Sequence, residues 1–281
     1  MRSADRNTGA NPSPDNTLKK WEKPHLPKPV TAVFSAVVTF SVWIIIWQIA
    51  YANIGISFIF PSPYQVVVEL LRLLPQKKFI ISVTGSMLRV ILGYLIGIAA
   101  SVAASFASHF FLPLKIFFSP FVKIVRATPV ASFILICVLW MPSDAVPVFI
   151  AFLMVFPVVY ENTLTGLSET PVELKEVASV YGFSRRQKLT LLYIPSVAPY
   201  FASACTTSLG LAWKAGISAE VLCVTRDSIG YYIYISKQYF ETASLFAWTV
   251  AIIVLSVLLE LAIKKSVGAL QRAVRRKYAG K

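Results

Sequence analysis

The chain has 281 residues, of which 56% are hydrophobic and 14% are charged, and its formal net charge is +14. Residues 30–52 and 90–108 contain no charged side chain. About 20 consecutive apolar residues are enough to cross a bilayer, so these stretches exclude a simple soluble protein. The basic excess could also indicate nucleic-acid binding, and the position of the charges along the chain has to decide.

A polar tail, residues 1–29, opens the chain and is expected to be flexible because it is rich in Asn, Pro, Ser and Lys. Six apolar segments follow and predict an all-α membrane protein with six transmembrane helices in one domain, residues 30–263. We place the segments at residues 30–52, 88–108, 124–141, 145–162, 193–217 and 243–263. An amphipathic stretch after Pro61-Ser62-Pro63 predicts a short helix on the membrane surface. Residues 264–281 form a basic tail.

The distribution of Lys and Arg predicts the orientation of these spans. Six spans place both chain ends on one side of the membrane, and that side carries 20 of the 27 Lys and Arg against five on the other. Lys and Arg are retained in the cytoplasm during insertion, so both termini are expected to be cytoplasmic. The orientation of the spans then accounts for the excess of Lys and Arg, and no nucleic-acid partner is needed to explain it.

The polar stretch between the fourth and fifth spans predicts a helix–Gly–helix elbow at residues 170–190. Thr170 to Glu173 form a capping box with Pro at the first helical position. Gly182 can adopt the left-handed conformation that ends a helix. Ser184 to Gln187 form a second capping box, which starts a helix leading into the fifth span. A loop that merely connects two spans is the alternative.

The same stretch carries a family resemblance. Glu176-Val177-Ala178, three residues, Gly182, nine residues and Leu192-Tyr193-Ile194-Pro195 resemble the EAA motif of ABC importer permeases. That motif reads E-A-A, three residues, G, nine residues, I-x-L-P. This chain departs from it only by apolar substitutions, at positions 177, 192 and 194.

Further motifs resemble the branch of this family that serves nitrate, sulfonate, taurine and thiamine-precursor importers. In chain order they are Pro61-Ser62-Pro63, Ser86-x-x-Arg89-Val90-x-x-Gly93-Tyr94, Arg126-Ala127-Thr128-Pro129-x-Ala131, Pro157, Asn162, Gly166, Ala212-Trp213, Ala219-Glu220 and Ser228-Ile229-Gly230. Together they cover roughly residues 58–263. One departure stands out: Trp140 is followed by Met141-Pro142, where branch members commonly have Phe-Gly.

The resemblance implies the MetI-like fold of type I ABC importers, in the cytoplasmic (inner) membrane of a bacterium. It also implies a permease dimer, most simply a homodimer, with two ABC ATPase subunits and an extracytoplasmic solute-binding protein. The chain lacks the phosphate loop G-x-x-x-x-G-K-[ST], so ATP and Mg would be bound by the ATPase and this chain would be no enzyme. The implied substrate is a small anion or vitamin precursor. A self-sufficient channel or secondary transporter is the alternative.

Candidate residues fall into three groups. Residues expected to couple the chain to the ATPase are Glu173, Glu176, Ala178, Gly182 and Pro195. Small residues recurring every four positions predict close helix packing: Gly93, Gly97 and Ser101 in the second span, and Ser208, Ala212 and Gly216 in the fifth. Candidates for the translocation path or gate are Arg89, Pro129, Trp213, Lys214 and Glu220.

Charged side chains inside spans are costly and point to function. Lys214 is expected either to face the path and meet an anionic solute or to extend its amine to the outer interface. Arg89 and Arg126 are expected near the cytoplasmic ends of their spans, with their charges reaching toward water. For Glu220 the resemblance implies a structural or gate role. The three cysteines have no metal-ligand or disulfide spacing, and we predict no metal or cofactor site in this chain.

Overall fold

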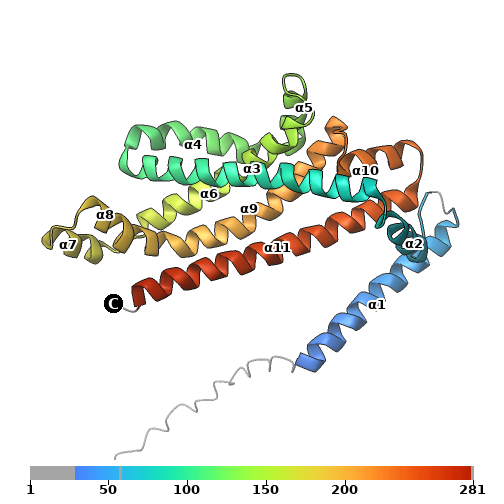
Figure 1. Ribbon diagram of the computed structural model, residues 1–281, viewed down its shortest axis with the longest axis horizontal. Coiled ribbons are helices and arrows are strands. Elements are labelled where there is room, and N and C mark those ends of the chain that lie inside the picture. Colours follow the sequence, from blue (N-terminus) through green and yellow to red (C-terminus); the bar gives the residue numbers. More distant parts are fainter. Residues whose placement is uncertain (1–28, 57–58, 280–281) are drawn as a thin grey trace, which may run out of the picture. The chain divides into compact units, whose positions relative to one another are not determined.

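The computed structural model describes residues 29–56 and 59–279, and every regular element in them is a helix (Figure 1). The chain divides after Ile46 into two compact units. Helix α1 (Pro29–Ile54) begins in the first unit, and its residues from Val37 onward are apolar enough to cross a membrane. The tail predicted at residues 1–29 lies outside the described residues except for its last one.

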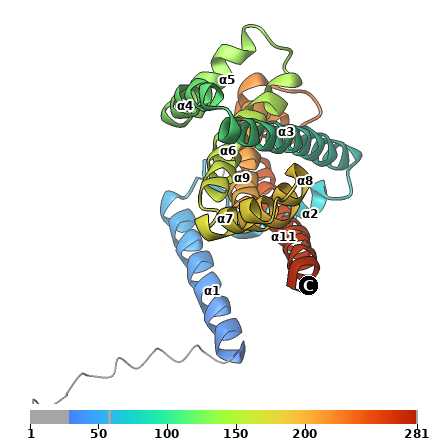
Figure 2. The same cartoon turned by 90° about the vertical axis from the view of Figure 1, so that its left-hand side faces the viewer.

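The second unit is built around three long helices, α3 (Lys77–Phe110), α6 (Ala145–Ser168) and α9 (Ile194–Cys223). Helix α6 packs extensively on both α3 and α9. A fourth long helix, α11 (Thr242–Ala279), packs on α9, as Figures 1 and 2 show. These contacts bury the main core of the unit.

The small residues predicted to pack helices lie in these contacts. A Cβ atom added to Gly93 would lie 2.2 Å from the carbonyl oxygen of Val148, and one added to Gly97 would lie 2.8 Å from the Cβ of Val155, both in α6. The Ser101 hydroxyl donates to the carbonyl of Phe156. In α9, Ser208 and Ala212 are buried, and a Cβ on Gly216 would lie 2.6 Å from a methyl of Val90 in α3.

Five described helices are long and apolar enough to span a membrane, and a bent pair brings the number to six. The pair consists of α4 (Leu112–Ala127) and α5 (Val130–Val138), which meet at 101°. The third span, predicted at residues 124–141, is therefore not one helix within those bounds but a bent pair that begins at Leu112 and ends at Val138. Pro129 lacks an amide hydrogen and disfavours helical backbone at Thr128, whose ψ is 133°, so the helix breaks there.

Short helices occupy the two ends of this bundle. At one end lie α7 (Val172–Val180), α8 (Arg185–Gln187) and a π-helical segment (Lys188–Tyr193) that continues into α9. At the other end lie α2 (Pro63–Leu73) and α10 (Ile229–Gln238), as Figure 1 shows. Helix α2 is the short amphipathic helix predicted from the sequence.

Candidate functional site

The elbow forms at residues 170–190, but only one of its two predicted capping boxes is present. The hydroxyl of Thr170 donates to the carbonyl of Gly166, four residues back, at 3.4 Å. Pro171 holds the N-cap position of α7 and no side chain caps it. Thr170 follows α6 so closely that a carbonyl of that helix takes its hydroxyl, a known competition with capping.

The second half of the elbow follows the sequence prediction. Gly182 has φ of +63°, and the Phe183 amide donates to the carbonyl of Ala178 at 2.9 Å, which closes α7. Ser184 and Gln187 then make the reciprocal capping box: the Ser184 amide donates to the Gln187 side chain at 2.8 Å, and the Gln187 amide donates to Ser184 Oγ at 3.3 Å. The turn is thus fixed by local chemistry.

The elbow exposes most of its side chains, including apolar ones. Glu173 and Glu176 are exposed, as a contact with another protein would require. Ala178 is instead buried, so the close approach that its small side chain permits is to its own chain. Pro195 is half-buried in the first turn of α9. The exposed apolar side chains are Val172, Leu174, Val177, Val180 and Tyr181.

A buried polar network centred on Glu220 occupies the opposite end of the bundle. Glu220, in the last turn of α9, is 0% exposed. Its Oε2 accepts hydrogen bonds from the Ser86 hydroxyl at 2.7 Å and from the Gly230 amide at 3.3 Å. Its Oε1 lies 3.5 Å from Nη1 of Arg89. The carboxylate therefore joins α3, α9 and the start of α10.

Arg89 extends this network and differs from its prediction. We expect it near a cytoplasmic end from the sequence, on the side of the elbow, yet it lies at the end opposite the elbow. Its Nη2 donates to Asp144 at 3.1 Å and to the carbonyl of Arg226 at 3.3 Å. Helix α3 begins at Lys77, so Arg89 is three turns inside it and can reach the loop after α9.

The segment between α9 and α10 is bent to meet these groups. Val224 and Asp227 both have φ of +50°, a conformation that is costly for residues other than Gly. The Ile229 amide donates to Ser86 Oγ at 2.9 Å. A Cβ on Gly230 would lie 2.4 Å from the Cβ of Glu220, so only Gly allows this approach. Ser86 and Ile229 lie more than 130 residues apart, and no local pattern in the sequence pairs them.

The remaining predicted path residues are separated in space. Trp213 is buried, and its indole donates to the carbonyl of Ile252 in α11 at 3.3 Å, so it packs inside the protomer. Lys214 is exposed on another face of α9. Pro129 sits at the bend between α4 and α5. Arg126, near that bend, is paired with Glu161 of α6.

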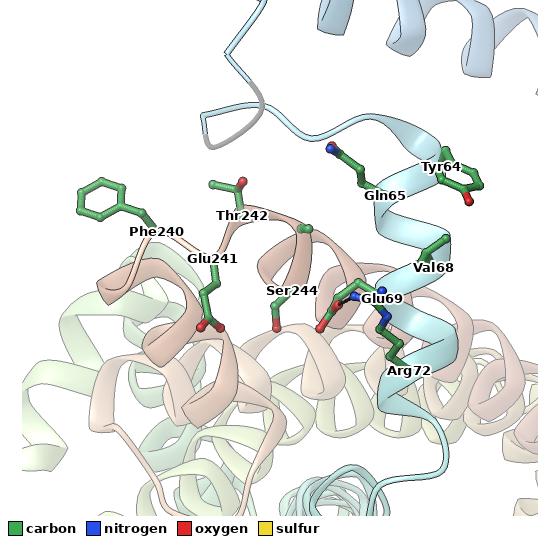
Figure 3. Close-up of a pocket in the computed structure, with 10 residues that line it drawn as sticks. Tyr64, Gln65, Val68, Glu69, Arg72, Phe240, Glu241, Thr242 and Ser244 are labelled. Atoms are coloured by element: carbon green, nitrogen blue, oxygen red, sulfur yellow. Dashed lines mark ion pairs between the residues drawn. The ribbon is translucent and has the colours of Figure 1, made fainter.

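A cavity of about 670 Å³ lies between α2 and the turn that begins α11 (Figure 3). Its polar lining includes Glu69, which lies 3.8 Å from Arg72, and the exposed Glu241. Ser244 lines the same space and is hydrogen-bonded to Ser236. In the described part of the chain no group of three or more His, Cys, Asp or Glu could hold a metal ion.

Comparisons with known proteins agree with this architecture. Among solved structures, a chain described as an amino acid ABC transporter with histidines superposes with a TM-score of 0.51 at 15% identity, covering 80% of this chain and 98% of that chain. That likeness concerns the fold alone.

Curated relatives give the same picture. A putative aliphatic sulfonates transport permease protein of Bacillus subtilis is 26% identical over 74% of this chain and 75% of its own length. The taurine transport system permease protein of Escherichia coli is 23% identical over 90% of this chain and 91% of its own length. A nitrate import permease protein of Synechococcus elongatus is 25% identical over 70% of this chain and 74% of its own length.

The model of one protein family, described as the binding-protein-dependent transport system inner membrane component, matches residues 93–276. The match covers most of the chain, including α6, the elbow, α9 and the Glu220 end of the bundle. Together with the long apolar helices, it shows that this chain belongs to that family, the multi-pass membrane permease components of ABC transporters.

Proposed function

We propose that two copies of this chain form the membrane path of an importer that a separate ATPase drives through the elbow at residues 170–190. The observation that carries this proposal is the exposed apolar surface of the elbow. Val180 is 83% exposed and Tyr181 is 75% exposed. Exposed apolar patches of soluble segments mark protein interaction sites, and the family works with partner proteins.

The elbow is connected so that a push on it would move the bundle. From Ser184 onward α8, the π-helical segment and α9 form one continuous helical run to Cys223. Helix α9 in turn contacts α3, α6, α10 and α11. An ATPase that binds the elbow more tightly in one state of the permease than in another would shift the permease toward that state.

One face of α9 supports a role in solute passage. Between residues 203 and 218, its exposed residues fall on one stripe: Ser203, Thr207, Leu211, Lys214 and Ser218. A charged side chain that faces lipid tails is costly, and Lys214 lies within this stripe. We propose that this stripe faces the path between two copies. No ion pair involves Lys214 among the described residues, so its charge is free to meet an anion.

The proposed solute is a small anion of the sulfonate or nitrate type. Relatives named for sulfonates, taurine and nitrate support this class, as does the positive charge of Lys214. The solute would be delivered by an external binding protein, with both termini of this chain in the cytoplasm. That orientation rests on the 20-to-5 distribution of Lys and Arg.

The coupling proposal is tested by Val180→Asp in transporter reconstituted with its ATPase and binding protein. We expect loss of uptake and of binding-protein-stimulated ATP hydrolysis, because a charge replaces an apolar contact. Ser179→Asp is the matched control, since it adds the same charge at the neighbouring exposed position without removing an apolar side chain. Equal uptake in both variants and in the unmodified transporter would contradict the coupling role.

A second test separates the importer from a channel or secondary transporter. Uptake of taurine, alkanesulfonates and nitrate is measured with and without the ATPase in the vesicles. The importer requires that uptake cease without the ATPase, whereas uptake that continues would favour the alternative. Lys214→Gln should raise the KM for the transported anion, and Lys237→Gln, an exposed charge on α10, should leave it unchanged.

A further inference from the structure

We infer that a cavity formed partly by the elbow binds the phosphate group of an anionic phospholipid. The cavity has a volume of about 650 Å³, within the range of about 300–1,000 Å³ of small-molecule sites. It lies where the end of α3 meets the run of helix that leads into α9. Its lining residues are Phe110, Phe111, Arg185, Lys188, Leu189 and Tyr193.

The charge of the cavity suits a phosphate. Arg185 and Lys188 are three positions apart on a helical segment, so their side chains project from the same side. None of the six lining residues is acidic. Across the described ranges, neither cation takes part in an ion pair with this chain's carboxylates. Arg offers a planar pair of donors to phosphate oxygens and Lys adds a point charge.

The other lining residues of the cavity are mainly apolar and suit acyl chains. Phe110 is 56% exposed and Phe111 is 63% exposed. The ring of Tyr193 meets the ring of Phe110 edge-to-face, with centroids 5.7 Å apart, and that of His109 at 5.5 Å. These rings join the end of α3 to the start of α9 and form a fixed surface. Two exposed phenyl rings offer neither charge nor hydrogen bonds, so they would contribute nothing to the binding of a free inorganic anion.

The depth of the cavity along the helices matches that of lipid headgroups. Helix α3 has 34 residues and is therefore about 51 Å long. The hydrocarbon core of a bilayer is about 30 Å thick and the bilayer with its headgroups about 40–45 Å. The last residues of α3 therefore reach the headgroup layer, where the phosphates of the lipids lie.

The π-helical segment accounts for the convergence of the lining residues. Lys188 and Tyr193 are five positions apart, which in an α-helix would place them about 140° from each other. Hydrogen bonding to the fifth residue brings such positions onto one side, and π turns recur at functional sites. Lys188, Leu189 and Tyr193 all line the cavity. A lipid bound there would hold the elbow against the end of α3.

The test measures lipid retention by the full-length permease in nanodiscs that contain phosphatidylglycerol and phosphatidylcholine, read by native mass spectrometry. The unmodified protein should retain phosphatidylglycerol in preference to phosphatidylcholine. Arg185→Gln with Lys188→Gln should reduce that preference about tenfold, equivalent to about 1.4 kcal/mol. Arg186→Gln with Lys265→Gln removes the same charge from exposed positions outside the cavity and should leave the preference unchanged.

A charge-preserving variant and two competitors complete the test. Arg185→Lys with Lys188→Arg keeps both charges and should restore retention if the first pair of changes acts through charge rather than folding. Equal loss in the Gln variants of both sites would overturn the proposal, because it would reflect net charge alone. Displacement of the lipid by inorganic phosphate would assign the site to free anions, and displacement by the ATPase would assign it to the coupling interface. Each of these results would overturn a lipid site.

Discussion

The two ends of the bundle differ in which side chains they bury: the α10 end buries polar groups, and the elbow end exposes apolar ones. At the α10 end, Glu220, Ser86 and Arg89 are drawn together and bonded within the chain. At the elbow end, the apolar side chains of Val180 and Tyr181 project outward. Buried polar groups are stable only when paired, whereas exposed apolar groups gain stability when a partner covers them. The buried polar groups of one end find most of their partners within the chain, whereas the exposed apolar side chains of the other end have none there.

The strongest test of the comparison is Glu220→Ala. Removing the carboxylate leaves the Ser86 hydroxyl, the Gly230 amide and the Arg89 guanidinium without their shared partner. We expect the free energy of unfolding to fall by about 2–6 kcal/mol, because two buried donors each lose a partner at a cost of about 1–3 kcal/mol, whereas Arg89 keeps its ion pair with Asp144. Denaturant unfolding of the purified permease in mixed micelles measures it.

Glu241→Ala is the control at the same end, because Glu241 is exposed. We expect a change within about 0.5 kcal/mol, as for most surface substitutions. If both variants lost the same stability, the α10 end would not depend on an internal network.

The next effect in size concerns α3, which links the two ends. Gly93→Ala would place a Cβ 2.2 Å from the carbonyl oxygen of Val148 and 2.9 Å from the Cβ of Ala151. Helices α3 and α6 would have to separate, at a cost of about 1–3 kcal/mol. Gly268→Ala, at a position with no heavy atom within 4 Å, is the control. The same unfolding assay should show no loss for that variant.

A smaller and more local effect is expected for Gly182→Ala. The φ of +63° at this position costs a residue with a Cβ about 1–2 kcal/mol. The elbow carries little of the core, so we expect faster hydrogen exchange over residues 172–187 with little change in global unfolding. A loss of global stability as large as that of Gly93→Ala would show that the elbow is part of the packed bundle.

The smallest predicted effect separates the two capping positions of the elbow. Ser184→Ala removes a formed capping box and should destabilise its turn by about 1 kcal/mol. Thr170→Val removes a hydroxyl that caps no helix and bonds weakly to Gly166, so its effect should be smaller. Hydrogen exchange of the amides in each turn compares them. Equal effects would indicate that Thr170 caps α7 after all.

Local sequence patterns predicted a good part of this molecule. Gly182 and the Ser184 box were predictable because their chemistry involves residues within four positions of each other. The small residues of α3 were predictable because their period matches one face of a helix. The 101° break at Pro129 was missed because an apolar run shows length but not direction, although Pro129 itself was the available signal.

The Glu220 network shows the limit of such patterns. Ser86, Arg89 and Glu220 each belong to a motif that the sequence singled out, yet nothing in those motifs joins positions that lie more than 130 residues apart. The expected position of Arg89 failed for a different reason: with cytoplasmic termini the second span begins on the outer side, so residue 89, at the start of that span, belongs at the outer end. The partners of Arg89 include carbonyl groups of a loop, and carbonyl groups are the same for every residue type.

The sequence by itself determined an all-helical membrane chain, the presence of the elbow and the family to which it belongs. These conclusions rest on features that neighbouring positions along the chain reveal. They are the length of apolar runs, the number of Lys and Arg between them and the residues that end helices. The tertiary structure decided which polar groups pair inside the bundle, which side of α9 stays open and where the third span bends. Those outcomes depend on helices meeting in three dimensions, where a buried charge finds the partner that its neighbours in sequence cannot supply.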